Sequence, residues 1–215
     1  EGHVTREDGA PFAGAMVSVF NAAKDRKETV YTDATGYYAI RSPFTGMLDV
    51  RVRAHAQQDK QVTLDANEVS LHTVNFTLQP FADAQALSDS LTASAHLTQI
   101  RWPNEEARKT FVSQCNYCHQ IGNALTRGPK EVSLWESTIA RMEGYGALLT
   151  NQEVSTIAER LHEGFTGSPV SSMQKYDASD ELARAKVLEW QAGDAMSFIH
   201  DSDVGQDGFL YGTDE

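Results

Sequence analysis

The chain has 215 residues, of which 40% are hydrophobic and 22% are charged, as in folded proteins of one or two domains rather than disordered chains. The net charge of −12 is uneven, because residues 1–80 contribute −2 and residues 81–215 contribute −10. This balance argues against nucleic acid or an anionic membrane as a partner and favours a partner with a basic docking surface. No apolar run approaches the ~18–20 residues of a membrane span.

Residues 1–79 are predicted to form a β domain of about seven short strands. Turn residues such as Asp8-Gly9-Ala10-Pro11 and Thr32-Asp33-Ala34-Thr35-Gly36 separate segments rich in β-formers. The expected strands cover Gly2–Thr5, Ala15–Phe20, Tyr37–Ile40, Met47–Ala54, Gln61–Leu64 and Val74–Leu78. Strands at this spacing are typical of a sandwich.

Three segments carry a family resemblance within this part: Gly2–Thr5, Gly9–Val19 and Thr32–Tyr38. They resemble the carboxypeptidase regulatory-like family, which has a transthyretin-like or immunoglobulin-like β-sandwich. The resemblance covers nearly all of residues 1–79 and implies a non-catalytic accessory domain. We therefore expect a β-sandwich over 1–80 that serves as a docking or assembly module.

Residues 81–102 are expected to form a connector. Pro80 ends the last strand, because proline donates no ladder hydrogen bond. The stretch 82–99 has Ala86, Leu87, Leu91 and Ala95 along one helical face. His96 also lies here and is interpreted as a polar surface histidine.

A helix opening at Pro103 leads into the motif Cys115-Asn116-Tyr117-Cys118-His119. C-x-x-C-H is the attachment pattern of a c-type haem, in which both thiols form thioethers and the histidine is the proximal iron ligand. A thiol redox pair and half of a zinc site are the alternatives, but the chain has no further cysteine to complete a zinc site. We expect one covalent haem c.

Two further helices follow the motif. Val132–Met142 is expected to end at Gly144 and Gly146, and Thr150 with Glu153 forms a capping box for a helix reaching about Phe165. Together with C-x-x-C-H, this order is similar to a class I c-type cytochrome domain, and to compact monohaem domains of sulfite and amine dehydrogenase systems. The predicted fold is thus an all-β sandwich followed by an all-α cytochrome c domain over residues 103–166.

The resemblance implies Met142 as the sixth iron ligand, with packing as the alternative role of this side chain. Met173 and His162 are the other candidate ligands. Arg127 and Trp135 are candidate hydrogen-bond donors to the haem propionates.

Residues 167–215 are expected to form an acidic tail, with a helix over 177–190. Asp201–Gly208 has a superficial likeness to a calcium loop but lacks a closing carboxylate, since Gly212 stands there. Gly208–Glu215 resembles the first propeller strand of lyase-like or quinoprotein repeats, which would make the chain the N-terminal part of a longer protein.

The sequence therefore predicts a periplasmic or extracellular monohaem cytochrome that transfers single electrons. Covalent haem is assembled outside the cytoplasm, and the start at Glu1 without Met is interpreted as that of an exported protein after signal removal. The alternative is an electron-accepting haem subunit or domain of a periplasmic dehydrogenase or lyase-like enzyme complex. In either case the partner is a redox protein, within a larger complex if the β-sandwich mediates assembly.

Overall fold

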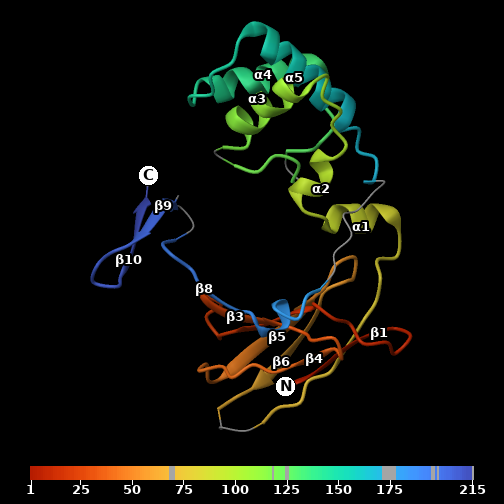
Figure 1. Cartoon of the computed structure of the whole chain (residues 1–215), viewed down its shortest axis with the longest axis vertical. Helices are drawn as coiled ribbons and strands as arrows, with labels where there is room; N and C mark the ends of the chain where they lie inside the picture. The colour runs from red at the N-terminus through yellow and green to blue at the C-terminus, as the bar shows by residue number, and fades with distance from the viewer. Residues whose placement is uncertain are drawn as a thin grey trace. The chain divides into compact units, whose positions relative to one another are not determined.

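The computed structural model describes residues 1–67, 71–117, 119–123, 126–170, 178–194, 197 and 199–214. The chain divides into two compact units. Glu1–Gln79 and Asp177–Glu215 form one, here called the β unit, and Pro80–Tyr176 form the other, here called the helical unit. Figure 1 shows strands at both ends of the chain and helices between them.

Seven strands lie in the described part of residues 1–79, and all except β3 correspond to predicted ranges. They are β1 (Gly2–Arg6), β2 (Met16–Phe20), β3 (Arg26–Tyr31), β4 (Tyr37–Tyr38), β5 (Met47–Arg53), β6 (Lys60–Asp65) and β7 (Phe76–Leu78). Strand β3 was not predicted, because Arg26, Lys27 and Glu28 interrupt any apolar alternation. In the structure Thr29 is buried, and its hydroxyl lies 2.8 Å from that of Ser18 on β2.

Two sheets enclose one core in the β unit. One has the order β4-β1-β7, and the other has the order β6-β5-β2-β3-β8. Alternate side chains along the strands are buried, as expected for sheets with one face inside. The core consists of Val4, Phe12, Ala15, Val17, Val19, Tyr38, Leu48, Val50, Val52, Ala54, Phe76 and Leu78.

The eighth strand comes from the tail and corrects the helix predicted over 177–190. Only Leu182–Arg184 form a short 3-10 turn, η1, while β8 (Lys186–Trp190) pairs antiparallel with β3. The open edge of β3 supplies backbone partners that the tail's own sequence does not reveal. Complementary charges fix the register, since Lys186 pairs with Glu28 at 3.1 Å and Lys27 with Glu189 at 2.7 Å.

The last two strands, β9 (Ile199–Val204) and β10 (Leu210–Asp214), form an antiparallel hairpin. Asp207, in the segment that is superficially like a calcium loop, closes the turn with its own carboxylate. Its Oδ1 accepts the Phe209 N–H at 3.1 Å, and its Oδ2 accepts the Tyr211 hydroxyl at 2.6 Å.

The helical unit contains α1 (Ala84–Ser90), α2 (Ala93–Leu97), α3 (Glu105–Cys115), α4 (Val132–Glu143) and α5 (Asn151–Gly164). The stretch 82–99 thus makes two short helices, since Leu91 and Thr92 are extended. Asn104 rather than Pro103 caps α3, with its Oδ1 accepting the Ala107 N–H at 2.8 Å. The end of α4 at Gly144 and the Thr150–Glu153 capping box are confirmed.

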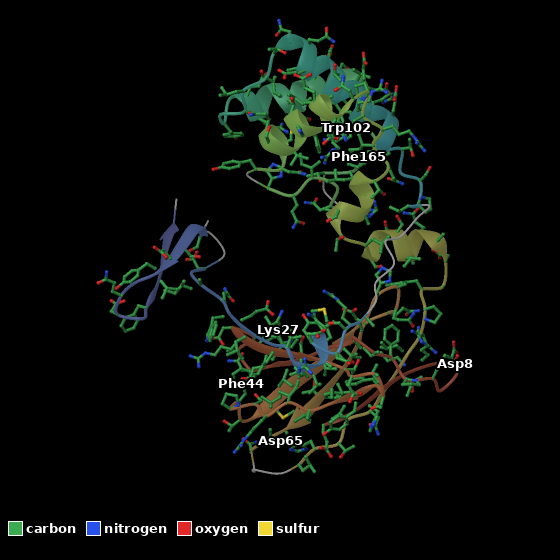
Figure 2. The ribbon with its side chains drawn as sticks, viewed as in Figure 1. Asp8, Lys27, Phe44, Asp65, Trp102 and Phe165 are labelled. Atoms are coloured by element: carbon green, nitrogen blue, oxygen red, sulfur yellow. The ribbon has the colours of Figure 1, made fainter. Side chains whose placement is uncertain are left out.

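One core holds the helical unit together. It consists of Ile100, Phe111, Trp135, Ile139, Ile157, Ala158, Leu161 and Phe165. The rings of Trp102 and Phe111 lie 4.7 Å apart between centroids. Figure 2 labels Trp102 and Phe165 in the helical unit. Of the helices in the described residues, none has the length and apolarity to cross a membrane.

The predicted fold class, an all-β sandwich followed by an all-α cytochrome c domain, is wrong. The described residues are mixed: five short α-helices lie between strands, and the strands form three sheets. The prediction failed because β8 becomes a strand only by pairing with β3, a long-range contact that local periodicity does not encode.

Candidate functional site

The first cysteine of the C-x-x-C-H motif ends α3. Phe111, one turn earlier, is buried in the helical core and carries this end of the helix inward. Cys115 is half-buried against the same core, and burial raises the pKa of its thiol to about 11. Cys118 lies outside the described residues.

The histidine of the motif is exposed to solvent. His119 Nδ1 lies 3.3 Å from the Gln120 carbonyl oxygen. A carbonyl only accepts hydrogen bonds, so this contact favours the tautomer with the proton on Nδ1, and Nε2 has no hydrogen-bond partner among the described residues. His119 therefore has a nitrogen available for a metal.

Met142 lies in the last turn of α4 and is half-buried. Its carbonyl accepts the Tyr145 N–H at 3.0 Å and the Ala147 N–H at 3.1 Å, which closes a tight turn. The next residue, Leu148, donates its N–H to Gln114 Oε1 at 2.8 Å. The segment after Met142 is therefore tied to the residue that precedes Cys115.

Large apolar side chains are exposed around this junction. Tyr117 is 79% exposed, Tyr145 79% and Leu148 80%, and Val112 on α3 is also exposed. We call these four residues the apolar rim. Scattered exposed apolar residues are ordinary, and these four are of interest because Val112 and Tyr117 lie within three residues of Cys115 while Leu148 contacts Gln114.

Trp135 on α4 is only 3% exposed, and its Nε1–H has no hydrogen-bond partner in the described residues. Its ring packs on Phe165, with 6.0 Å between centroids, and Lys130 Nζ lies 4.2 Å from the ring centroid. A buried indole N–H nearly always has a partner, so this donor fits an acceptor that the described residues do not supply.

Arg127 contacts the connector helices. Its Nη2 donates to Asp89 Oδ1 at 2.7 Å, and its Nη1 lies 3.0 Å from His96 Nδ1. His96 is 1% exposed, and its Nε2 lies 2.8 Å from the Ser88 carbonyl oxygen. The interpretation of His96 as a surface histidine is therefore wrong, because its burial depends on Arg127, 31 positions later in the sequence.

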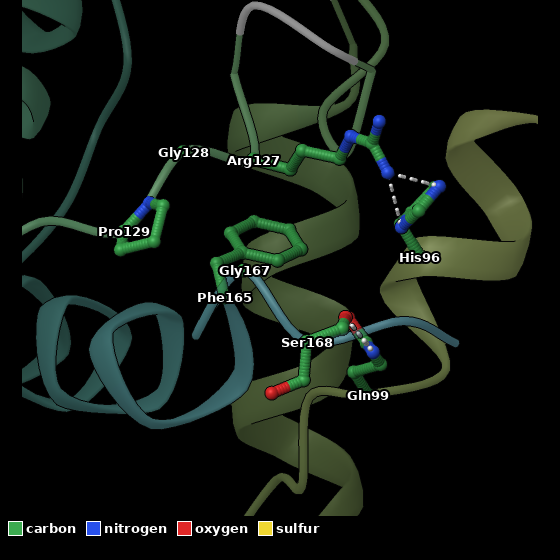
Figure 3. Close-up of a pocket in the computed structure, with 8 residues that line it drawn as sticks. All are labelled: His96, Gln99, Arg127, Gly128, Pro129, Phe165, Gly167 and Ser168. Atoms are coloured by element: carbon green, nitrogen blue, oxygen red, sulfur yellow. Dashed lines mark hydrogen bonds between the residues drawn. The ribbon is translucent and has the colours of Figure 1, made fainter. Parts of the chain in front are cut away.

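A cavity of about 170 Å³ lies beside this cluster. Figure 3 shows Arg127 and His96 on one side, Pro129 and Phe165 on the other, and Ser168 accepting from Gln99 below them. The cavity is smaller than sites for whole cofactors, which usually exceed about 300 Å³. It has room for a short polar arm of a larger group.

Of the alternative iron ligands, Met173 lies outside the described residues. His162 on α5 is exposed, and its Nδ1 lies 2.8 Å from the Lys130 carbonyl oxygen. This contact ties α5 to the segment before α4, and it gives His162 a structural role.

The comparisons with known proteins concern the other unit. A model of the carboxypeptidase regulatory-like domain matches residues 1–79. This match and the two-sheet core support the β-sandwich resemblance. A search of curated proteins gave no match.

The residues around Cys115 fit a covalent haem. The apolar rim offers an apolar surface to the porphyrin. The Trp135 N–H, which has no partner in the described residues, can donate to a propionate carboxylate, and Nε2 of His119 can bind iron. These observations come from the structure rather than from the C-x-x-C-H pattern.

Proposed function

We propose that the chain carries one haem c, attached through Cys115 and Cys118, and that it transfers single electrons as a periplasmic or extracellular monohaem cytochrome. The observation that carries the proposal is the position of Cys115. A half-buried thiol, at the end of a helix and beside an uncovered apolar rim, is suited to anchor a large apolar group.

The same position argues against the alternative of a thiol redox pair. Reactive C-x-x-C cysteines have lowered pKa values and sit at helix N-termini, where the dipole stabilises a thiolate. Cys115 sits at the C-terminal end of α3, and burial raises the pKa of its thiol to about 11. A free thiol in this place is a poor nucleophile.

Each residue of the site has a role in this proposal. Cys115 and Cys118 hold the porphyrin edge, and His119 offers Nε2 as proximal ligand while its Nδ1–H contacts Gln120. Met142 is the proposed sixth ligand, and Trp135 is a donor to a propionate. The haem supplies a ferric–ferrous couple when bound, and a thioether sixth ligand raises its potential relative to a second histidine.

The division into two units changes which part of the chain we expect to contact a basic partner. Residues 177–215 carry a net charge of −8, whereas the helical unit carries only −2. We therefore place the docking surface for a basic redox partner on the β unit, which contains the regulatory-like domain and the acidic tail. This supports docking or assembly as the role of that unit.

The second candidate is an electron-accepting haem subunit or domain of a periplasmic dehydrogenase or lyase-like complex. The regulatory-like match favours attachment to a larger assembly, because that family is typically an accessory. Co-purification from the native source separates the two candidates, since a free carrier elutes alone and a subunit elutes with its enzyme.

Expression in a host that attaches haem c tests the site. Met142→Ala is expected to abolish the weak long-wavelength absorption band of a methionine–ferric iron bond, while covalent haem is retained. Met173→Ala and His162→Ala are the matched controls and should keep the band. Loss of the band in Met173→Ala instead would move the sixth ligand to the tail.

A further inference from the structure

The connector helices α1 and α2 make specific contacts with the segment that follows the haem motif. Gly122, three residues after His119, has a φ of +97°, and a Cβ there would lie 2.8 Å from the Ala93 carbonyl oxygen on α2. Only glycine combines this backbone conformation with so close an approach. The segment after His119 therefore packs directly on α2.

A second contact is the cluster of Asp89, His96 and Arg127. His96 Nε2 lies 2.8 Å from the Ser88 carbonyl oxygen, and Arg127 Nη1 lies 2.6 Å from Nε2 and 3.0 Å from Nδ1. Because a guanidinium only donates, the ring nitrogen that accepts from Arg127 carries no proton. His96 is thus neutral, and burial followed by the Arg127 charge lowers its pKa despite the opposing Ser88 and Asp89 effects. Hydrogen bonds from Gln85 and then Arg127 lower the pKa of Asp89, which stays anionic.

A third contact joins α1 to the end of the helical unit. The Val170 N–H donates to Ser88 Oγ at 3.1 Å, and Ser88 is fully buried. Arg127 and Phe165 line the same cavity, and Phe165 packs on Trp135 (Figure 3). In the sequence, Arg127 lies between His119 and Trp135. The proposed function places both of these residues in contact with the haem.

We propose that α1 and α2 form a wall of the haem site that sets the electrostatic field there: Asp89 offsets the charge of Arg127, and neutral His96 fixes the direction of its guanidinium. This inference rests on the proposed function. The Arg127 side chain is only 15% exposed, so water screens its charge less than that of a surface arginine. Arg127, Asp89 and His96 are positioning residues in this scheme.

The sign of the effect follows from the charge on the iron. Ferric haem carries one more positive charge than ferrous haem, so a nearby cation favours the ferrous form and raises the reduction potential, while an anion lowers it. Removing Asp89 therefore raises the potential, and removing Arg127 lowers it. A purely structural role would move both variants in one direction, because both would let water reach the haem.

The experiment compares midpoint potentials of the haem-loaded full chain at one pH and low ionic strength. We expect Asp89→Asn above the wild type, Arg127→Gln below it, and the double variant close to it. Arg127→Lys keeps the charge and should lie nearer the wild type than Arg127→Gln. Arg108→Gln is the matched control, because Arg108 pairs with Glu105 at the opposite end of α3 from Cys115 and should leave the potential unchanged.

The inference is overturned if Asp89→Asn and Arg127→Gln shift the potential in the same direction, or if neither shifts it more than Arg108→Gln. If Arg127→Gln does not fold, Asp89→Asn and Arg127→Lys still test the sign. Failure of the proposed function gives a different result, since the wild-type chain would then carry no covalent haem at all.

Discussion

The two units differ in the hydrogen bonding of a polar aromatic side chain buried in each core. The β unit closes twelve buried apolar residues between its two sheets, and its Tyr38 hydroxyl, with a pKa raised by burial to about 12, donates to the Val74 carbonyl. The helical unit leaves the apolar rim exposed and the Trp135 N–H without a partner in the described residues. The difference teaches where the proposed haem would act, since it would give the Trp135 N–H an acceptor and cover part of the apolar rim.

The largest expected effect comes from removing both anchoring thiols. In Cys115→Ala/Cys118→Ala we expect the helical unit to lose protease resistance while the β unit keeps it, because the haem is proposed to fill the uncovered surface. Limited proteolysis followed by mass mapping measures this. Equal resistance of both units in the haem-free variant would break the comparison.

Core truncations should act on one unit at a time. Phe111→Ala is expected to destabilise the helical unit by about 3–5 kcal/mol, because Phe111 is fully buried in its core. Leu78→Ala is the corresponding change in the β unit and should lower the free energy of unfolding of that unit by about 2–5 kcal/mol. Thermal unfolding followed by haem absorption and by far-ultraviolet circular dichroism separates the two. Loss of both signals together in either variant would contradict independent cores.

Local features of the fold were predicted from the sequence, whereas long-range features were not. The capping box at Thr150, the end of α4 at Gly144 and six of the seven strands in the described part of residues 1–79 depend on neighbouring residues, and they were predicted. Strand β8 and buried His96 depend on partners far along the chain, and they were not. The C-x-x-C-H spacing indicated the cofactor, but only the structure revealed the apolar rim and the cluster at Arg127.

The pH dependence should be confined to the helical unit in mildly acidic conditions. Burial keeps the pKa of His96 below its ordinary 6.5 in the folded state, so the unfolded chain binds more protons as pH falls below 6.5. Stability of this unit should therefore decrease from pH 7.5 to 5.5, with a slope of at most about 1.4 kcal/mol per pH unit. Unfolding titrations of the wild type and His96→Asn test this. An equal slope in His96→Asn would assign the effect to other groups.

The smallest expected effect concerns the cap of α5. Thr150→Ala removes the side-chain acceptor of the Glu153 N–H and should cost the helical unit about 1 kcal/mol. Thr150→Ser keeps the acceptor and serves as the control. The regulatory-like domain should unfold unchanged in both variants, and a shift there would show that the units are coupled.

Covalent haem on the motif is the central claim, and one peptide tests it. Trypsin cleavage after Lys109 and Arg127 releases residues 110–127, which contain Cys115, Cys118 and His119. After expression with a c-type maturation system, mass spectrometry should find this peptide heavier by one haem that acidic acetone does not extract. The same peptide with free thiols or a disulfide, in a host that matures a control cytochrome, would contradict the account.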